Sequence, residues 1–264
     1  MHRLAISPCP NDTFAFYALL HGKTSWRAPF DLQYLDIEEL NHLCMSGAVD
    51  FCKISFHAYV LLRDRFRLLR SGSALGFGCG PLVVCKENYS RESLIGKRIA
   101  IPGRYTTAAL LLKLWLGEEA ELVEMVFDRI MPAVADGDVD AGLIIHESRF
   151  TYAQHGLSSA VDLGDWWEKE TGFPIPLGGI VARKDLPESE IVAFENALSD
   201  SIAYAFDQRE ETVPYMREHA QEMARDVMDA HVDLYVNDFT RDLGQKGNAA
   251  IKHLVERVEA LGNV

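Results

Sequence analysis

The stretch Gly47-Ala48-Val49-Asp50 recurs later in the chain as Gly137-Asp138-Val139-Asp140. An apolar helix face with the spacing i, i+3, i+7 precedes each copy, and an apolar strand follows each copy. The face residues are Ile37, Leu40 and Cys44 before the first copy, and Phe127, Ile130 and Val134 before the second. Helices that end in this way before a strand are common in α/β proteins, so chance similarity is one explanation. We favour a structural repeat, because doubly wound folds are built from similar βα units.

Short apolar strands alternate with amphipathic helices along most of the chain, which predicts an α/β fold with mostly parallel sheets. After residues 178–182 the pattern is helical to the end. The expected strands are 4–6, 32–35, 51–54, 81–85, 98–101, 122–126 and 141–145. The expected helices are 13–21 with Asp12 as N-cap, 37–45, 106–116, 128–135, 188–208, 212–223 and 232–243.

Two segments rich in Gly and Pro, 72–81 and 172–179, each precede a strand and suit crossings of the chain between lobes. They predict a discontinuous first lobe, 1–86 plus 177–264, with the second lobe, 87–176, inserted in it. Ligands of open α/β sheets bind beyond the carboxyl ends of the strands, so we expect a ligand cleft between the lobes. Ser55 and Phe56 would face it from one lobe, and Ile145 and His146 from the other.

The 264 residues include 26 Lys and Arg against 39 Asp and Glu, which gives a formal net charge of −13. This acidic balance argues against nucleic acid as a partner. The apolar runs are shorter than the ~18 residues of a membrane span, and no secretory signal pattern is visible. The five cysteines have no C-x-x-C spacing, and the histidines show no metal-ligand spacing. We therefore expect a cytoplasmic protein without disulfides, bound metal or membrane contact, and its oligomeric state stays open.

The turn 102–108 joins a predicted strand to a predicted helix and contains Gly103, Thr106 and Thr107. Gly103 permits close backbone approach, while the Thr hydroxyls and the free N–H groups of a helix start suit a carboxylate or phosphate. A Thr N-cap without any ligand is the alternative. The spacing matches neither common nucleotide-binding motif, so we favour a small anionic molecule over a nucleotide phosphate.

His146 is the strongest candidate for a general base, because it ends a buried strand and an imidazole titrates near ~6.5. The alternative is a histidine that is hydrogen-bonded at a strand terminus. Glu147 is a weaker candidate to orient the ring, and Arg149 could pair with an anion. His57 is the rival base, but the helical pattern that continues after it favours a structural role.

Lys53 and Ser55, at the end of strand 51–54, are placed to bind substrate, although Lys53 could instead be a solvated strand residue. Asn11 and Asp12, in the turn after strand 4–6, could cap the next helix, reach a ligand, or do both. Cys9 shows neither the nearby base nor the electropositive setting that a nucleophilic thiol needs.

Six short motifs occur in an order that is specific as a set, although each motif alone is weak. They are Ser7-Pro8-Cys9-Pro10-Asn11-Asp12-Thr13-Phe14, Gly103-x-x-Thr106-Thr107-Ala108, Ile145-His146-Glu147, Asp162-Leu163-Gly164-x-Trp166-Trp167-Glu168, Pro174-Ile175-Pro176-Leu177-Gly178 and His231-Val232-x-Leu234-Tyr235-Val236-Asn237. Over nearly its whole length the chain resembles the 1,4-dihydroxy-6-naphthoate synthases, which are enzymes of the futalosine route of menaquinone biosynthesis.

The resemblance implies a periplasmic-binding-protein-like fold of type II, with two lobes of mixed, mostly parallel sheets, used for catalysis in the cytoplasm. It implies a cofactor-independent carbon–carbon lyase that converts cyclic dehypoxanthinyl futalosine to 1,4-dihydroxy-6-naphthoate and dihydroxyacetone. The family's proton-accepting histidine maps onto His146. Its substrate contacts map onto Lys53, Ile54 and Ser55 and onto the pair Thr106-Thr107.

Two other functions stay open at this point. The chorismate dehydratases of the same pathway share the bilobed fold but lack this set of motifs. A cytoplasmic protein that binds a small anion without catalysis is the second alternative. Turnover of the cyclic substrate by the purified protein, set beside turnover of chorismate, would separate the three functions.

Overall fold

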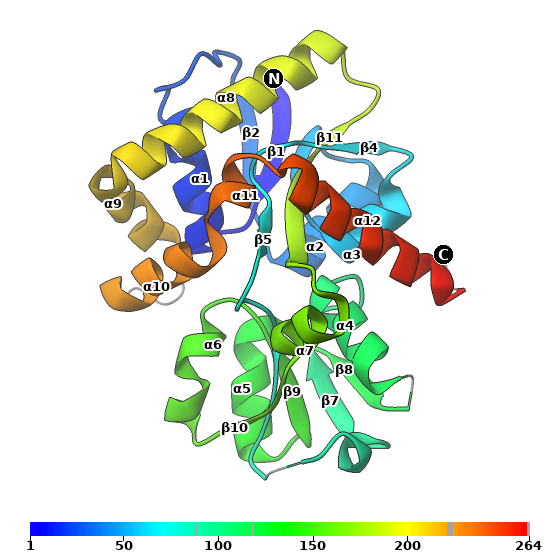
Figure 1. The fold of residues 1–264 in the computed structure, drawn as a ribbon. Helices are drawn as coiled ribbons and strands as arrows, with labels where there is room; N and C mark the ends of the chain where they lie inside the picture. Colours follow the sequence, from blue (N-terminus) through cyan, green and yellow to red (C-terminus); the bar gives the residue numbers. More distant parts are fainter. Residues whose placement is uncertain (88, 118, 221–223, 263–264) are drawn as a thin grey trace. The chain divides into compact units, whose positions relative to one another are not determined.

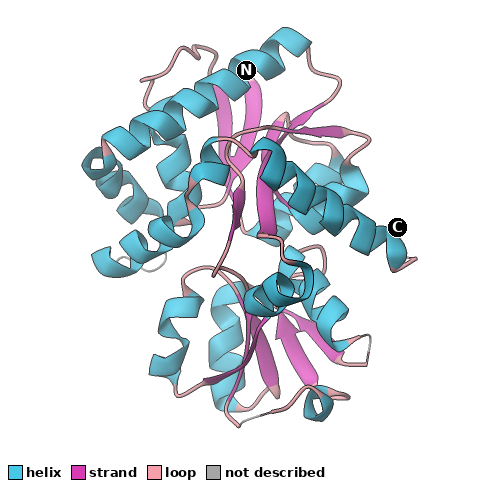
Figure 2. Ribbon diagram, viewed as in Figure 1, coloured by secondary structure: helices cyan, strands magenta, loops and turns pink. Residues whose placement is uncertain are grey.

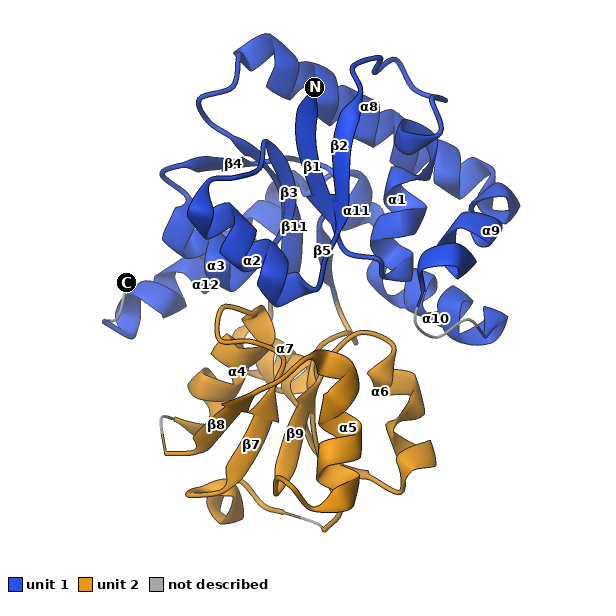
Figure 3. Ribbon diagram, turned by 180° about the vertical axis from the view of Figure 1, so that it is seen from behind, with its two compact units in different colours: residues 1–76, 176–264 blue, residues 77–175 orange. Residues whose placement is uncertain are grey.

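The computed structural model describes residues 1–87, 89–117, 119–220 and 224–262. The chain folds into two compact units, Met1–Gly76 with Pro176–Val264, and Phe77–Ile175 (Figures 1 and 3). Both units combine a sheet with helices on its faces (Figure 2), which confirms the predicted α/β class. None of the described helices has both the length and the hydrophobicity of a transmembrane segment. The cytoplasmic location stays a prediction.

The sheet of the first unit has the strand order β2-β1-β3-β11-β4, and β5 also pairs with β11. Strands β1, β2 and β3 are parallel, whereas β11 runs antiparallel to β3 and β4. The strands are β1 His2–Ile6, β2 Phe30–Tyr34, β3 Phe51–Ser55, β4 Phe66–Leu68, β5 Ala74–Gly76 and β11 Ile175–Arg183. The helices are α1 Pro10–Leu20, α2 Ile37–Ser46, α3 Phe56–Leu62, α8 Glu188–Asp207, α9 Arg209–His219, α10 Arg225–Tyr235, α11 Asp238–Arg241 and α12 Gly244–Ala260.

The sheet of the second unit has the order β10-β6-β9-β7-β8, with β7, β8 and β9 parallel and β6 antiparallel to β9. Its strands are β6 Leu82–Cys85, β7 Arg98–Ile101, β8 Glu121–Glu124, β9 Ala141–Ile144 and β10 Ser158–Asp162. Its helices are α4 Thr107–Leu116, α5 Phe127–Asp136, α6 Ser148–Thr151 and α7 Leu163–Thr171, with single 3₁₀ turns at Glu92–Leu94 and Tyr152–His155.

The internal repeat is structural, because the two sheets share one plan. The parallel set β2-β1-β3 with antiparallel β11 in the first unit corresponds to β8-β7-β9 with antiparallel β6 in the second. Helices α2 and α5 each end at a glycine in the left-handed conformation, with φ 72° at Gly47 and 84° at Gly137. The predicted face residues of both helices are buried.

The aspartate of each repeat makes the same pair of hydrogen bonds to the neighbouring parallel strand. The Asp50 carboxylate accepts from the Arg3 N–H at 2.8 Å, and its own N–H donates to the Arg3 carbonyl at 3.0 Å. Asp140 repeats this with Arg98, at 2.9 Å and 3.0 Å. Each pair ties the start of one strand to the start of the next and so fixes their register.

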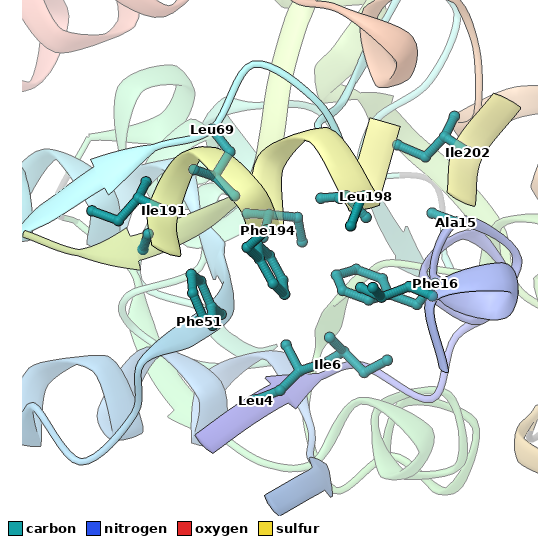
Figure 4. Close-up of a cluster of buried hydrophobic side chains, with 14 residues drawn as sticks. Leu4, Ile6, Ala15, Phe16, Phe51, Leu69, Ile191, Phe194, Leu198 and Ile202 are labelled. Atoms are coloured by element: carbon teal, nitrogen blue, oxygen red, sulfur yellow. The ribbon is translucent and has the colours of Figure 1, made fainter. Parts of the chain in front are cut away.

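The core of the first unit lies between its sheet and helices α1 and α8 (Figure 4). The rings of Phe51 on β3 and Phe194 on α8 stack with centroids 3.8 Å apart and planes 9° apart. Leu4 and Ile6 of β1 and Phe16 of α1 pack in the same cluster and have no exposed surface. In the second unit α5 packs directly on β9, because Gly142 leaves the space that Ile130 and Val134 fill.

Several expected boundaries differ from the structure. The first crossing falls after Gly76 instead of residue 86, because β6 pairs with β9 and β10 in the second unit. Helix α1 begins at Pro10 with Cys9 as N-cap, so Asp12 lies in its first turn and is not the N-cap. The helix expected at 232–243 is wrong, since α10 ends at Tyr235 and α11 is separate. The helix expected at 212–223 runs to His219, and its last three positions lie outside the described residues.

Removal of the Phe194 ring tests the core of the first unit. We expect Phe194→Ala to lower the free energy of unfolding by about 3–5 kcal/mol, through lost burial and the cavity left behind. Val192 lies on the same helix with an exposed side chain, so Val192→Ala is the control and should change it by less than about 0.5 kcal/mol. Chemical denaturation measures both, and equal effects would contradict this assignment of the core.

The Asp140 contact has a defined pH dependence. The Arg98 N–H, and after it the Lys97 ammonium, lower the pKa of Asp140 below its ordinary value. A lowered folded-state pKa contributes stability above the unfolded pKa of about 4, and that stability is lost as the pH falls further. We expect Asp140→Ala to destabilise the protein at neutral pH, by an amount that shrinks between about pH 5 and pH 2. Asp138→Ala, at an exposed neighbour, should show no such dependence in the same denaturation series.

Candidate active site

The first unit gathers polar side chains where β1 and β3 end. Asp12 and Lys53 form an ion pair of 2.7 Å between Oδ1 and Nζ, and their side chains are only 3% and 6% exposed. Asp12 also accepts from the Asn11 amide at 2.8 Å and from the Ser7 N–H at 3.2 Å. Its place in the first turn of α1 adds a favourable helix dipole. Lys53 is therefore a buried, paired lysine, and the alternative of a solvated strand residue is wrong.

Ser55, at the tip of β3, is held by a buried asparagine. Asn41 on α2 donates to the Ser55 hydroxyl at 3.1 Å and accepts from the Ser55 N–H at 3.0 Å. The Ile54 side chain between Lys53 and Ser55 is fully buried in the sheet. Of the strand-end segment, Lys53 and Ser55 thus present polar groups, while Ile54 anchors the strand.

Two residues of this network were not expected from the sequence. His231 on α10 is buried, and its Nε2 lies 2.9 Å from the Asn11 Oδ1. Asn41 follows Ile37 by four positions and therefore lies on the apolar face of α2. A polar residue on this face is the sequence feature that could have identified Asn41. His231 belongs to one of the ordered motifs, but its sequence spacing predicts neither a metal site nor a contact with Asn11.

In the second unit, Thr106 is the N-cap of α4. Its hydroxyl accepts from the Ala109 N–H at 3.1 Å and donates to the Gly103 carbonyl at 2.7 Å. Thr106 thus has the N-cap role that was the alternative to ligand binding. Its hydroxyl both donates and accepts a hydrogen bond within the protein. Thr107 is also buried, at the first position of the helix. Ligand binding at this helix start stays a prediction.

His146 follows β9 by two residues and has a backbone conformation that few histidines adopt. Its φ is 56°, the only positive value at a described residue other than glycine. Such a conformation costs about 1–3 kcal/mol and persists only where surrounding structure imposes it, often at functional sites. The imidazole is half-buried, with its centroid 5.0 Å from that of the Phe127 ring. Because β7 and β9 are parallel neighbours, His146 and Thr106 follow strand ends at the same edge of the sheet.

The neighbours of His146 have separate structural tasks. Glu147 is buried and precedes α6. The guanidinium of Arg149 pairs with Asp162 at 2.5 Å and donates to the carbonyls of Gly80 and Gly78 at 2.9 and 3.3 Å. The Arg149 guanidinium therefore binds groups of the protein itself, whereas the sequence suggested that it could pair with a bound anion. His57 lies within α3, as the helical pattern after it predicted, and its structural role stays a prediction.

The comparisons with known proteins agree over the whole chain. A family described as menaquinone biosynthesis matches residues 2–260. A Thermus thermophilus protein named 1,4-dihydroxy-6-naphthoate synthase is 50% identical over 98% of this chain and 94% of its own length. A Streptomyces coelicolor protein of the same name is 45% identical over 99% of this chain and 94% of its own.

The chain belongs to the 1,4-dihydroxy-6-naphthoate synthase family of menaquinone biosynthesis. This confirms the resemblance carried by the six ordered motifs.

Solved structures support the fold. A structure from Archaeoglobus fulgidus is 42% identical, with a TM-score of 0.94 over 100% of this chain and 98% of that one. The periplasmic aliphatic sulphonate binding protein of Escherichia coli is 13% identical, with a TM-score of 0.68 over 100% and 88%. That second likeness concerns the fold alone and confirms the periplasmic-binding-protein-like architecture.

The buried Asp12–Lys53 pair can be tested by removal of one partner. We expect Lys53→Met to lower the free energy of unfolding by about 3–5 kcal/mol, because it leaves the Asp12 carboxylate buried without its counter-ion. The double variant Asp12→Asn/Lys53→Met should recover part of this loss, since no buried charge is then left over. Denaturation of the wild type, Asp12→Asn, Lys53→Met and the double variant in parallel measures the coupling, and strictly additive losses would contradict it.

Proposed function

We propose that this protein is a carbon–carbon lyase that converts cyclic dehypoxanthinyl futalosine to 1,4-dihydroxy-6-naphthoate and dihydroxyacetone. The observation that carries the proposal is the full-length similarity, at 50% and 45% identity, to two proteins named for that product. The left-handed backbone at His146, in a motif at the end of β9, supports a specialised role for this residue.

In the proposed reaction the neutral imidazole of His146 takes a proton from the substrate. The electron pair of the broken bond drives cleavage of a carbon–carbon bond, and formation of an aromatic ring favours the products. The proton returns to the departing three-carbon fragment, so the step needs no oxidant or reductant. A positioned general base of this kind contributes about 10²–10⁴ in rate.

The remaining residues are proposed to bind the substrate. The helix start at Thr106 and Thr107 suits the substrate carboxylate, because the N-terminus of a helix carries the positive end of the helix dipole and favours a bound anion. Lys53, Ser55, Asn11 and Asp12 offer a paired ammonium, a hydroxyl, an amide and a carboxylate at the strand ends of the first unit. A contact from Ile54 would use its main chain, because its side chain is fully buried.

Chorismate dehydratase chemistry is the alternative within the same pathway. The names of both relatives favour the naphthoate-forming reaction. Purified protein, incubated separately with the cyclic substrate and with chorismate and analysed by mass spectrometry, tests the choice. We expect the naphthoate from the first mixture and unchanged chorismate from the second; binding without turnover would indicate the non-catalytic alternative.

His146→Asn separates the base from the backbone that carries it. Asparagine tolerates the left-handed conformation better than most residues but cannot act as a general base. We expect His146→Asn to lower kcat by about 10²-fold or more, while the Kd for substrate changes little. His155→Ala, an exposed histidine of the same unit, is the control and should keep the normal rate. A near-normal kcat for His146→Asn would remove His146 from the proposed mechanism.

A further inference from the structure

The strained conformation of His146 must be maintained by something outside the residue itself. Non-glycine residues with bulky side chains avoid positive φ, and they hold it only where the surrounding contacts leave no alternative. The segment that follows is too short to supply that constraint alone, because α6 spans only Ser148–Thr151 and a single helical turn is unstable in isolation. Side-chain contacts between this segment and the rest of the second unit contribute to that constraint.

Arg149 provides several contacts of this kind. Its guanidinium binds three acceptors in two other chain segments: Nη1 donates to the Gly80 carbonyl, while Nη2 donates to the Gly78 carbonyl and to Asp162 Oδ2. The Arg149 side chain is 17% exposed and that of Asp162 28%, so the pair is better shielded than a typical surface ion pair. The Arg149 N–H also points to the His146 carbonyl, at 3.4 Å.

The geometry of the sheet explains why this arginine reaches so far. Ile144, Leu82 and Asp162 lie directly opposite one another on the adjacent strands β9, β6 and β10. Arg149 follows the end of β9, and the carbonyls that it contacts precede the start of β6. Its guanidinium therefore spans one edge of the sheet, from the end of β9 to the end of β10.

Asp162 divides its two carboxylate oxygens between two tasks. Oδ2 binds Arg149, whereas Oδ1 accepts from the N–H groups of Gly164 and Asp165 at 2.9 and 3.1 Å and caps α7. Gly164 packs so closely on the Gly78–Gly80 loop that a Cβ there would lie 2.2 Å from the Cys79 carbonyl oxygen. All three acceptors of Arg149 are therefore attached to the start of α7, and together they hold the guanidinium in place.

We propose that Arg149 is a positioning residue for His146: by its attachment to Asp162, Gly78 and Gly80 it fixes the segment after β9 and so the direction of the imidazole. This proposal rests on the proposed function of His146 as the base. Arg149 does not need to touch the substrate, and its effect on the reaction passes through the geometry of the histidine.

Two variants break the attachment from opposite sides. Arg149→Lys keeps the positive charge but lacks the planar fork that serves three acceptors. Asp162→Asn keeps a cap for α7, because asparagine is a good N-cap, but removes the charged partner of the guanidinium. Arg98→Lys is the matched control, since the Arg98 guanidinium also donates to a backbone carbonyl, that of Asp138 at 2.7 Å, and lies at the opposite end of the same sheet.

The measurements are kcat, KM, the melting temperature and the ring ¹³C resonance of His146, assigned by its loss in His146→Asn. We expect Arg149→Lys and Asp162→Asn to lower kcat about 10-fold or more, as a small misplacement of a catalytic group does. We expect KM to stay within about twofold, the His146 resonance to shift in both variants, and Arg98→Lys to match the wild type. A kcat within twofold of normal, or a fall in kcat with an unmoved His146 resonance, would overturn the proposal.

The outcome is separable from that of the proposed function. The His146 resonance reports the position of the ring whether or not the enzyme turns over its expected substrate. If His146→Asn is inactive and Arg149→Lys is normal, only the positioning role fails. If Arg149→Lys does not fold, Asp162→Asn carries the test, because its cap on α7 is retained.

Discussion

In each unit an aspartate at the start of one strand accepts a hydrogen bond from the backbone of the neighbouring parallel strand, and its own N–H returns one. Asp50 and Arg3 form this pair in the first unit, and Asp140 and Arg98 form it in the second. The pair fixes register at the amino end of the sheet, so the opposite ends of the strands come abreast. In the first unit this register allows Lys53 and Asp12 to meet at the strand ends. In the second unit it places His146 and Thr106 after strand ends at one edge of that sheet.

The candidate site residues are held by contacts that would not be needed for folding alone. A buried ammonium and carboxylate pay a desolvation cost that a pair of apolar side chains would avoid. The left-handed backbone at His146 has a cost of its own. Both features lie at strand ends, where α/β proteins place their ligand sites. The occurrence of one such feature at the strand ends of each sheet is the physical reason to associate these residues with chemistry.

Much of the fold was predictable because hydrophobic periodicity reports burial directly. The helix faces of Ile37, Leu40 and Cys44, and of Phe127, Ile130 and Val134, were read from spacing and are buried as expected. The positions of Lys53, Ser55 and His146 at or just after strand ends were predictable for the same reason. Asn41, His231 and the anchoring of Arg149 were not, because their partners are distant in sequence and no local pattern encodes which carbonyl or carboxylate they reach. The first crossing was misplaced because a Gly-rich segment marks a change of direction without showing which sheet the following strand joins.

The first unit is assembled from both ends of the chain, and this has a consequence for its synthesis. Strand β11 lies between β3 and β4 in the sheet, yet nearly all of Phe77–Ile175 is translated before it. During synthesis the edges of β3 and β4 that pair with β11 stay unpaired until β11 is made. The second unit is continuous in sequence and can complete its own sheet before then. An inserted unit that folds early also brings the two ends of its segment to defined positions and shortens the search by which β11 finds its place. The connectivity of the chain therefore favours one order of folding, in which the inserted second unit folds first and the first unit is completed last.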